Sequence, residues 1–584
     1  MNTLVIVLIA AVVLVCAYAG YGRWLAKTWG VDPNAKTPAV RLEDGKDYVP
    51  TKGWTVFAHQ FSSIAGAGPV TGAIQAAAFG WLPVLLWVLI GGVFFGAVTD
   101  FGALYASVKN DGKSMGLLIE KYIGKTGRKL FLLFCWLFCG IVIAAFADMV
   151  AGTFNAFDAD GAQVEAAFTN GAAGMVSIMF MLFAVVFGFI QKKFNFSGWR
   201  EAVIGIIFIV LSFAVGMNCP LVFGKTAWSY ITFVYIFFAA VLPMWMLKQP
   251  RDYMTTFMFG AMIAGAVIGL LVAHPTMNLP VFTGFNNAKL GTMFPILFVT
   301  VACGAVSGFH SLVSSGTSSK TVENEKDMLK VGYGAMVLES LLAVLALCVA
   351  GAAAAADGTP ATGTPFQIFS RGVAGFFEMF GVPVSIATVF MTMCVSALAL
   401  TSLDAVARIG RMSFQELFSV DDMEHAEGWR KLFCNVYFST FITLVFGFIL
   451  TQIGYANIWP LFGSANQLLS ALVLATLCVF LKVTGRNNKM LFPPLVIMLC
   501  VTFTALVQRL IAMVKAISAA ASTAIPAGET TWGAVFIANG LQLILAVLLI
   551  VLGLNIVFHS VKSYTTCDAP EAKDNATATA KANA

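Results

Sequence analysis

The sequence predicts an all-α polytopic membrane protein with about 15 transmembrane helices, counted by the length that crosses a bilayer. Of its 584 residues, 59% are hydrophobic and 11% are charged, whereas an ordinary soluble protein carries about 25% charged residues. Apolar runs of roughly 20 residues recur from one end of the chain to the other. Lysine and arginine gather in every second connection between these runs, which is typical of cytoplasmic loops.

The apolar runs place the spans along the chain. The first run, 2–22, has no basic segment before it, so we interpret it as a span and not as a cleaved signal peptide. Two connecting segments, 107–129 and 364–381, mix polar and apolar residues and are typical of amphipathic helices at a membrane surface. The windows after the first are 54–80, 81–106, 129–153, 173–191, 199–217, 227–247, 254–274, 292–317, 331–352, 383–406, 431–451, 457–481, 490–513 and 532–558.

The charges in the connections predict the orientation of the chain. The positive-inside rule places the N-terminus outside the cell and the C-terminus in the cytoplasm. The net charge of +6 is then a topology signal, and no nucleic-acid partner is expected. The cations of alternate connections include Arg23, Lys27, Lys109, Lys113, Lys192, Lys193, Lys248, Arg251, Lys320, Lys326, Arg408, Arg411, Lys482 and Arg486.

Two predicted spans are interrupted by glycine and hydroxyl residues. "FSSIAGAGPVTG" (61–72) lies in the second span, and "VACGAVSGFHSLVSSGT" (301–317) lies in the ninth. An interruption within lipid frees backbone N–H and C=O groups, which something must satisfy. In transporters, released carbonyls of such broken helices bind cations, and their half-helix N-termini bind anionic substrates near the midplane. These two spans are an odd number apart, so they run in opposite directions, as an inverted repeat requires.

The interruptions supply the predicted substrate site. Each places a histidine before a pair of serines, and histidine can exchange a proton near neutral pH. His59 and His310 are therefore also the predicted proton-coupling residues. A glycine-rich packing face is the alternative, and we interpret Gly92 and Gly96 in that way. The predicted substrate ligands are His59, Ser62, Ser63, Gly66, Gly68, Ser307, His310, Ser311, Ser314 and Ser315.

Four stretches carry a resemblance to a known family: 47–116, "GFHSLVSSGTSSKTVENE" (308–325), "ALTSLDAVARIGR" (399–411) and "WPLFGSANQLLSAL" (459–472). Together they resemble the carbon starvation protein A family, which includes bacterial peptide and pyruvate transporters. The resemblance implies a secondary active transporter related to the amino acid–polyamine–cation superfamily. It also implies a LeuT-like inverted repeat, whose halves would begin near residues 54 and 292.

The same resemblance implies a sodium site. In sodium-coupled relatives of that fold, the helix corresponding to the eleventh span supplies adjacent hydroxyls to a cation, and here that helix carries Thr401 and Ser402. Backbone oxygens near Ala65 in the first break would complete the site, since small cations prefer oxygen ligands. Hydrogen bonds from both hydroxyls back to their own helix are the equal alternative.

Other polar residues within the spans are secondary candidates, because ionisable groups in a membrane are costly. Asp148 is a lesser candidate for a proton relay. Asp100 and Asp404 are placed near cytoplasmic ends, and Asp404 precedes Arg408 by one helical turn, which favours a structural ion pair. The remaining candidates are Glu339 and the pathway or helix-packing residues Ser464, Asn466 and Gln467.

We therefore expect residues 1–562 to form one transmembrane transporter domain and 563–584 a disordered cytoplasmic tail. The expected function is import of short peptides or pyruvate across the bacterial inner membrane in carbon starvation, by alternating access, with protons favoured over sodium. The expected partners are the substrate, the coupling cation and membrane lipid; no cofactor is expected, and protein partners stay open. A nutrient sensor is the alternative. An enzyme is not expected, because "GKSMG" (112–116) follows no strand and no metal cluster appears.

Overall fold

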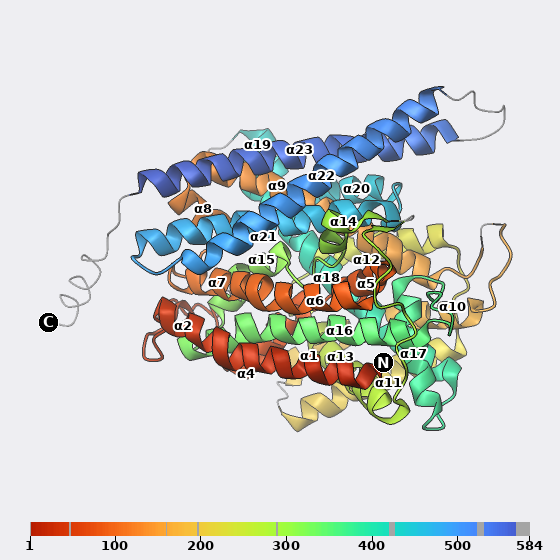
Figure 1. The fold of residues 1–584 in the computed structure, drawn as a ribbon. Coiled ribbons are helices and arrows are strands. Elements are labelled where there is room, and N and C mark those ends of the chain that lie inside the picture. The colour runs from red at the N-terminus through yellow and green to blue at the C-terminus, as the bar shows by residue number, and fades with distance from the viewer. Residues whose placement is uncertain are drawn as a thin grey trace.

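Among the described residues of the computed structural model, eleven helices are long and apolar enough to cross a membrane, and the long helices lie side by side (Figure 1). The structure describes residues 2–45, 48–158, 160–194, 198–243, 245–287, 290–419, 427–522 and 531–567. The predicted all-α polytopic class is confirmed. The number of about 15 spans stays a prediction.

The long helices follow the predicted windows closely, because apolar runs of this length bury their backbone polar groups within the helix itself. In chain order they are α1 (Thr3–Ala17) with η1 (Tyr18–Gly22) and α2 (Arg23–Trp29), α6 (Trp81–Gly91) with η3 (Gly92–Gly96) and α7 (Ala97–Val108), α9 (Lys125–Phe154), α10 (Ala167–Phe194), α11 (Trp199–Asn218), α13 (Lys248–Ala273), η6 (Leu329–Gly334) with α16 (Ala335–Ala353), α18 (Val384–Phe418), α21 (Tyr455–Val483), α22 (Phe492–Ser522) and α23 (Thr531–Thr566). Two shorter apolar helices, α12 (Lys225–Val241) and α20 (Val436–Thr451), also lie in predicted windows.

Two helices are broken where the sequence predicted it. The first consists of α4 (Gly53–Ile64) and α5 (Gly68–Ala76), and the second of α14 (Met293–Thr300) and α15 (Gly308–Gly316). The Thr51 N–H donates to the Thr321 carbonyl at 2.9 Å, so the start of the first broken helix lies beside the end of the second. At the other end, the Thr283 hydroxyl donates to the Ala78 carbonyl at 2.8 Å. The two broken helices therefore run in opposite directions.

The elements that follow each broken helix come in the same order. A long helix with a π-helical turn comes next (α6–η3–α7; η6–α16), then a short helix, then another long helix (α9; α18). The short helices are α8 (Met115–Tyr122) and α17 (Pro365–Glu378), which lie in the two segments predicted to be amphipathic. The long helices α9 and α18 pack against each other in the centre. This repeated order in opposite directions supports the predicted inverted repeat.

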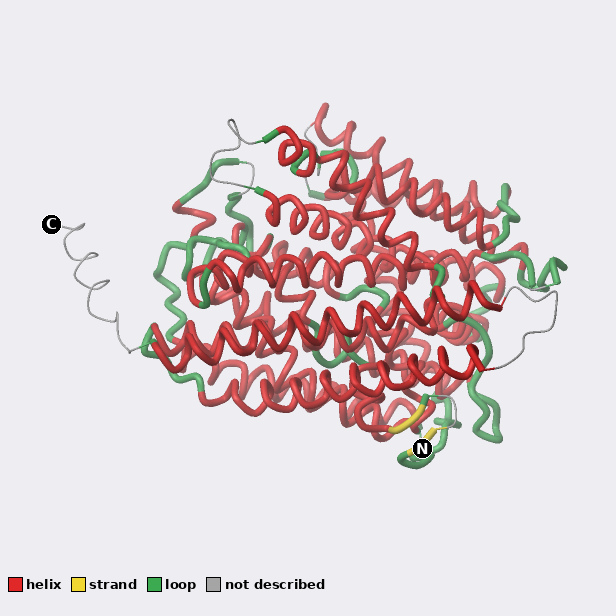
Figure 2. The backbone as a smooth tube through the Cα atoms, turned by 90° about the horizontal axis from the view of Figure 1, so that it is seen from above, coloured by secondary structure: helices red, strands yellow, loops and turns green. Residues whose placement is uncertain are grey.

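The remaining elements are short. Figure 2 shows the strand pair of the described residues, β1 (Asn286–Asn287) with β2 (Gly291–Thr292), near the N-terminus. The helix α23 continues to Thr566, past the predicted start of the tail at 563, and residues 568–584 lie outside the described part. The other short helices are α3 (Pro38–Arg41), η2 (Ala77–Phe79), η4 (Ser318–Lys320), η5 (Glu325–Asp327), α19 (Gly428–Phe433) and η7 (Lys489–Leu491).

Candidate functional site

The first break consists of residues 65–67, between α4 and α5. Pro69 comes directly after the first residue of α5, a position where the missing proline N–H costs no helical hydrogen bond. A Cβ at Gly66 would overlap the Ser402 hydroxyl, and a Cβ at Gly68 would overlap the Cys303 sulfur. Glycine at both positions therefore lets the break lie directly against α18 and the second break.

The second break, residues 301–307, is held by a side chain from α21. The Asn466 Oδ1 accepts the Phe309 N–H at 3.1 Å, in the first turn of α15, and the Ser307 hydroxyl at 3.2 Å. A Cβ at Gly308 would lie 2.5 Å from the Leu469 Cβ, so this glycine permits the close approach of α15 to α21. Asn466 thus satisfies one of the N–H groups that the break frees.

A narrow cavity lies between the two breaks. Gly66, Gly68, Cys303, His310, Ser402 and Asn466 contribute to its wall. Its volume of about 20 Å³ is about what one water molecule needs. Because α5 and α15 both begin beside it, the positive ends of two half-helices face this space.

His310 lies between two carboxyl groups. Its Nδ1 is 2.9 Å from Asp100 Oδ2 on α7, and its Nε2 is 3.3 Å from Glu339 Oε2 on α16. All three side chains are buried. Asp100, expected near a cytoplasmic end, is the fourth residue of α7 and belongs to this cluster.

The two predicted histidines have different neighbours. His59 is half-buried on α4 and lies within electrostatic reach of Lys248 and Asp252 on α13, whereas His310 lies beside the two carboxyl groups. A shared role of the two histidines therefore stays a prediction. His59 is not among the residues that line the cavity.

The predicted serine ligands divide into two groups. The Ser307 hydroxyl bonds to Asn466 beside the cavity, and the buried Ser311 hydroxyl has no hydrogen-bond partner within the described residues. Ser62 donates to the His59 carbonyl and Ser315 to the Ser311 carbonyl. Ser314 accepts a bond from Gln60, and Ser63 is buried without lining the cavity. A direct substrate contact by these four serines therefore requires another conformation.

The structure brings only some of the predicted cation ligands close to the first break. The Thr401 hydroxyl donates to the Ala397 carbonyl at 2.8 Å, which is the local bond that the alternative interpretation expects. The Ser402 hydroxyl instead faces Gly66, the residue after Ala65. The described residues contain no group of three or more His, Cys, Asp or Glu side chains that could hold a metal ion.

Two other candidates are held in ion pairs. Asp148 lies 2.8 Å from Lys225 Nζ and accepts the Tyr455 N–H at the start of α21 at 2.8 Å. These contacts favour a structural role over a proton relay. Asp404 pairs with Arg408 at 3.1 Å, as expected, and also with the buried Arg251 at 3.0 Å.

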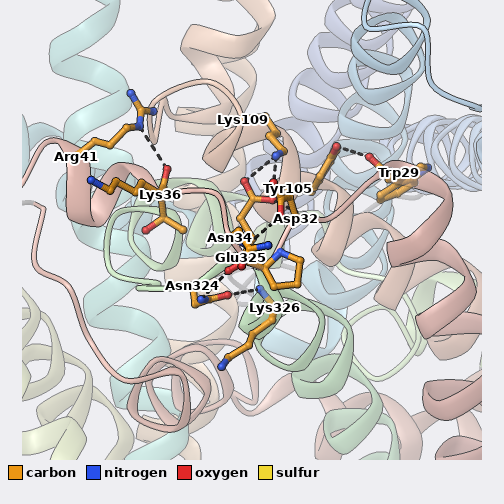
Figure 3. A network of polar contacts seen from close by, with 12 residues as sticks. Trp29, Asp32, Asn34, Lys36, Arg41, Tyr105, Lys109, Asn324, Glu325 and Lys326 are labelled. Atoms are coloured by element: carbon orange, nitrogen blue, oxygen red, sulfur yellow. Dashed lines mark hydrogen bonds and ion pairs between the residues drawn. The ribbon is translucent and has the colours of Figure 1, made fainter. Parts of the chain in front are cut away.

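A separate polar network connects the N-terminal segment with α7 and η5 (Figure 3). The buried Glu325 carboxylate accepts hydrogen bonds from Lys109 Nζ at 2.6 and 2.9 Å and from the Asp32 N–H at 3.0 Å. Beside it, the Tyr105 hydroxyl donates to the Trp29 carbonyl at 2.5 Å. This network holds together the end of the bundle at which α4 begins and α15 ends.

Sequence reasoning found both breaks but not the partners of His310. Asp100 and Glu339 were candidates because they are ionisable residues within apolar runs. The sequence did not show that both lie beside His310. Asn466 was likewise a candidate whose role as the acceptor for α15 could not be read from the sequence. Gln467, by contrast, donates to the Phe298 carbonyl at 2.7 Å, a helix-packing bond.

Comparison with known proteins finds close similarity in sequence. The chain is 31% identical to the "Peptide transporter CstA" of Escherichia coli, over 86% of this chain and 80% of that protein. It is 30% identical to the protein of the same name from Bacillus subtilis, over 84% and 87%. It is also 36% identical to the "Pyruvate/proton symporter BtsT" of E. coli, over 60% of this chain and 49% of that protein.

Comparison with solved structures finds only distant similarity. A manganese transporter of Eremococcus coleocola has a TM-score of 0.43 at 10% identity, covering 89% of this chain and 99% of that one. MhsT in complex with L-phenylalanine has a TM-score of 0.43 at 13% identity, covering 85% and 98%. The sequence profile of the family described as "Carbon starvation protein CstA" matches residues 2–359 and 351–505. The chain is therefore a member of the carbon starvation protein CstA family.

Proposed function

We propose that this multi-pass membrane protein is a proton-coupled importer of small carboxylate-bearing nutrients, either short peptides or pyruvate. Its relatives are named as peptide transporters and as a pyruvate/proton symporter, which makes this chain a transporter of peptides or pyruvate and not an enzyme. The proposal also places the protein in the bacterial inner membrane, with its C-terminus in the cytoplasm, and gives it a role in carbon starvation. The alternating cations of the loops support that orientation.

The observation that carries the proposal is the pair of half-helix N-termini at one buried cavity. Helix N-termini present N–H groups and positive partial charge, which favour an anion such as a carboxylate. His310 in the same wall adds an imidazole, a side chain that can bind and release a proton. Substrate would thus bind among Gly66, Gly68, Ser307 and His310.

The size of the cavity supports alternating access. A space of about 20 Å³ admits about one water molecule, so pyruvate or a peptide can enter only after the helices around it move apart. The Lys109–Glu325 pair and its network would open when the bundle opens at that end.

Sodium coupling is the second candidate, because the Ser402 hydroxyl faces the first break at Gly66. Oxygen ligands from Ser402 and from backbone carbonyls would suit a small cation. The Thr401 hydroxyl donates its hydrogen to its own helix, which leaves its oxygen lone pairs free to bind a cation. We favour protons because His310 lines the cavity between the breaks and an imidazole can bind and release a proton.

Uptake of labelled pyruvate into proteoliposomes tests the proposal, with proton and sodium gradients imposed separately and with di- and tripeptides as competitors. We expect accumulation driven by the proton gradient, with either pyruvate or a labelled peptide as substrate. Accumulation that follows only the sodium gradient would favour the second candidate. Absence of flux for both substrates under either gradient would contradict transport and favour a sensor.

A further inference from the structure

Three ionisable side chains form an isolated cluster in the centre of the bundle. Asp100 comes from α7, His310 from α15 and Glu339 from α16, and their side chains are at most 1% exposed. The cluster joins the second broken helix to two helices that carry π-helical turns, η3 and η6. Such turns occur frequently at functional sites.

The hydrogen bonds of this cluster are incomplete. Within the described residues, Asp100 Oδ1, His310 Nε2 and both oxygens of Glu339 have no hydrogen-bond partner. An ionised carboxylate with no donor would be very costly at this depth. A proton on Glu339 removes that cost, and Oε2 of this carboxyl group lies 3.3 Å from His310 Nε2. The geometry therefore favours a neutral Glu339 beside an ionised Asp100 that accepts the Nδ1–H.

The surrounding elements leave these three groups to interact mainly with one another. Cys303, in the second break, lies within electrostatic reach of Glu339. The Tyr333 hydroxyl of η6 donates to the Val93 carbonyl. The lysines on the neighbouring elements have other partners: Lys109 with Glu325, Lys330 with Asp327, Lys320 over Tyr48 and Lys482 over Tyr564.

Small residues hold the three helices at this short distance. A Cβ at Gly96 would overlap the Ala305 carbonyl oxygen of the second break, and a Cβ at Gly92 would overlap the Ser340 hydroxyl on α16. On η6, a Cβ at Gly332 would lie 2.8 Å from the Phe101 Cα, directly after Asp100. The glycines interpreted as a packing face thus bring Asp100, His310 and Glu339 together.

We propose that Asp100, His310 and Glu339 form the proton-binding site of the transport cycle, a proposal that rests on the proton-coupled function proposed above. Before loading, Glu339 carries one proton, the imidazole carries one on Nδ1, and Asp100 is ionised. On loading, the Glu339 O–H bond breaks and its proton forms an N–H bond at Nε2. The entering proton then forms a new O–H bond on Glu339, and the cluster changes from one negative charge to zero.

His310 connects this site to the substrate. The imidazole contacts both carboxyl groups and also lines the cavity between the breaks. After loading it is a cation, which attracts a substrate carboxylate; before loading it is neutral. Substrate and proton therefore favour each other's binding, and by reciprocity each raises the affinity for the other by the same factor.

The test compares Glu339→Gln and His310→Gln with two matched controls in proteoliposomes. Glu120→Gln removes a partly exposed carboxylate that pairs with Arg128, and His559→Gln removes a histidine on α23 whose ring bonds to its own helix. Uphill uptake under a proton gradient is measured beside counterflow exchange, which needs no gradient. We expect Glu339→Gln to lose uphill uptake by about tenfold or more, the range of a typical coupling between sites, while it retains counterflow. His310→Gln should lose both, and the controls neither.

The outcomes separate this inference from the proposed function. If the wild type shows no uptake driven by protons, the proposed function fails. If the wild type is driven by protons and Glu339→Gln is driven equally well, the proton site proposed here is wrong. Glutamine resembles a protonated glutamate in shape, so this variant should fold; Asp100→Asn is the second variant if it does not.

A measurement in detergent tests the site without transport. Pyruvate, or the peptide that the uptake assay identifies, is added to purified protein in weak buffer with a pH indicator. We expect the wild type and Glu120→Gln to take up a proton as substrate binds, and Glu339→Gln to bind substrate with little or no proton uptake. Proton uptake by Glu339→Gln equal to the wild type would overturn the proposal.

Discussion

Two substitutions that move one methyl group from α16 to the second break test how closely these segments pack. They are Gly304→Ala in the second break and Ala343→Gly on α16. A Cβ at Gly304 would lie 2.6 Å from the Ala343 Cβ, and its next neighbours are Pro69 atoms at 3.6 and 3.8 Å. Carbon atoms pack best about 3.5–4.0 Å apart, so Gly304→Ala must push one helix away by about 1 Å. Ala343 lies one turn after Glu339, and the same displacement would widen the proton site.

The expected cost of Gly304→Ala is about 1–3 kcal/mol, the usual penalty for an extra methyl group in a packed core. Ala343→Gly alone should cost about 1 kcal/mol from glycine within a helix and roughly 0.8 kcal/mol from the lost buried methyl. In the double variant the new methyl fills the space that Ala343 vacates. We therefore expect the double variant to be more stable than the sum of the single changes by at least about 1 kcal/mol, as found for residues in contact.

The free energy of unfolding in mixed detergent micelles measures these costs, with uptake in proteoliposomes as the second assay. Gly260→Ala on α13 is the control, because a Cβ there meets nothing within 4 Å, and it should be neutral or slightly stabilising. Additive costs in the double variant would refute the predicted contact between the break and α16. A cost for Gly260→Ala as large as that of Gly304→Ala would contradict the overlap with Ala343 as the cause of the lost stability.

Two further changes test other parts of the structure. Asn466→Ala removes the acceptor of the Phe309 N–H. We expect it to lower the free energy of unfolding by about 0.5–2 kcal/mol, as for loss of a helix cap, and to reduce uptake in the same proteoliposomes. Unchanged stability and uptake would contradict the role of Asn466. Asp404→Asn leaves the buried Arg251 without one of its carboxylates and should cost about 3–5 kcal/mol of unfolding free energy. Asp111→Asn is the control, because it breaks an ion pair with Arg41 on the exposed surface and should cost at most about 1 kcal/mol. Equal costs for the two aspartate variants would contradict the burial of the Arg251 network.

The positions of the helices and of both breaks could be predicted from the sequence because each depends on local composition. Apolar runs specify where helices cross, and glycine, proline and serine within 61–72 and 301–317 mark where helical hydrogen bonds stop. The opposite directions of the two broken helices followed from the order of the spans alone. The structure confirms both breaks and their directions.

The partners within the site could not be predicted, because they depend on helix rotation and on contacts between distant segments. His310 and Asp100 are 210 residues apart in the chain and meet at 2.9 Å. The expected pairing of His59 with His310 rested on matching sequence patterns, whereas the faces of α4 and α15 direct the two rings toward different neighbours. The local bond of Thr401 and the ion pair of Asp404 were predictable alternatives, since both partners lie one turn away on the same helix.

A structure determined with bound substrate would test the central claim most directly, namely that a carboxylate is held between the two broken helices. The measurement is the position of pyruvate, or of the peptide that the uptake assay identifies, in the protein at saturating substrate. The account predicts the carboxylate beside the start of α15, within hydrogen-bond distance of His310 or of the N–H groups near Gly308, with the cavity enlarged. Substrate bound elsewhere, with the space between Gly66 and His310 still closed, would contradict it.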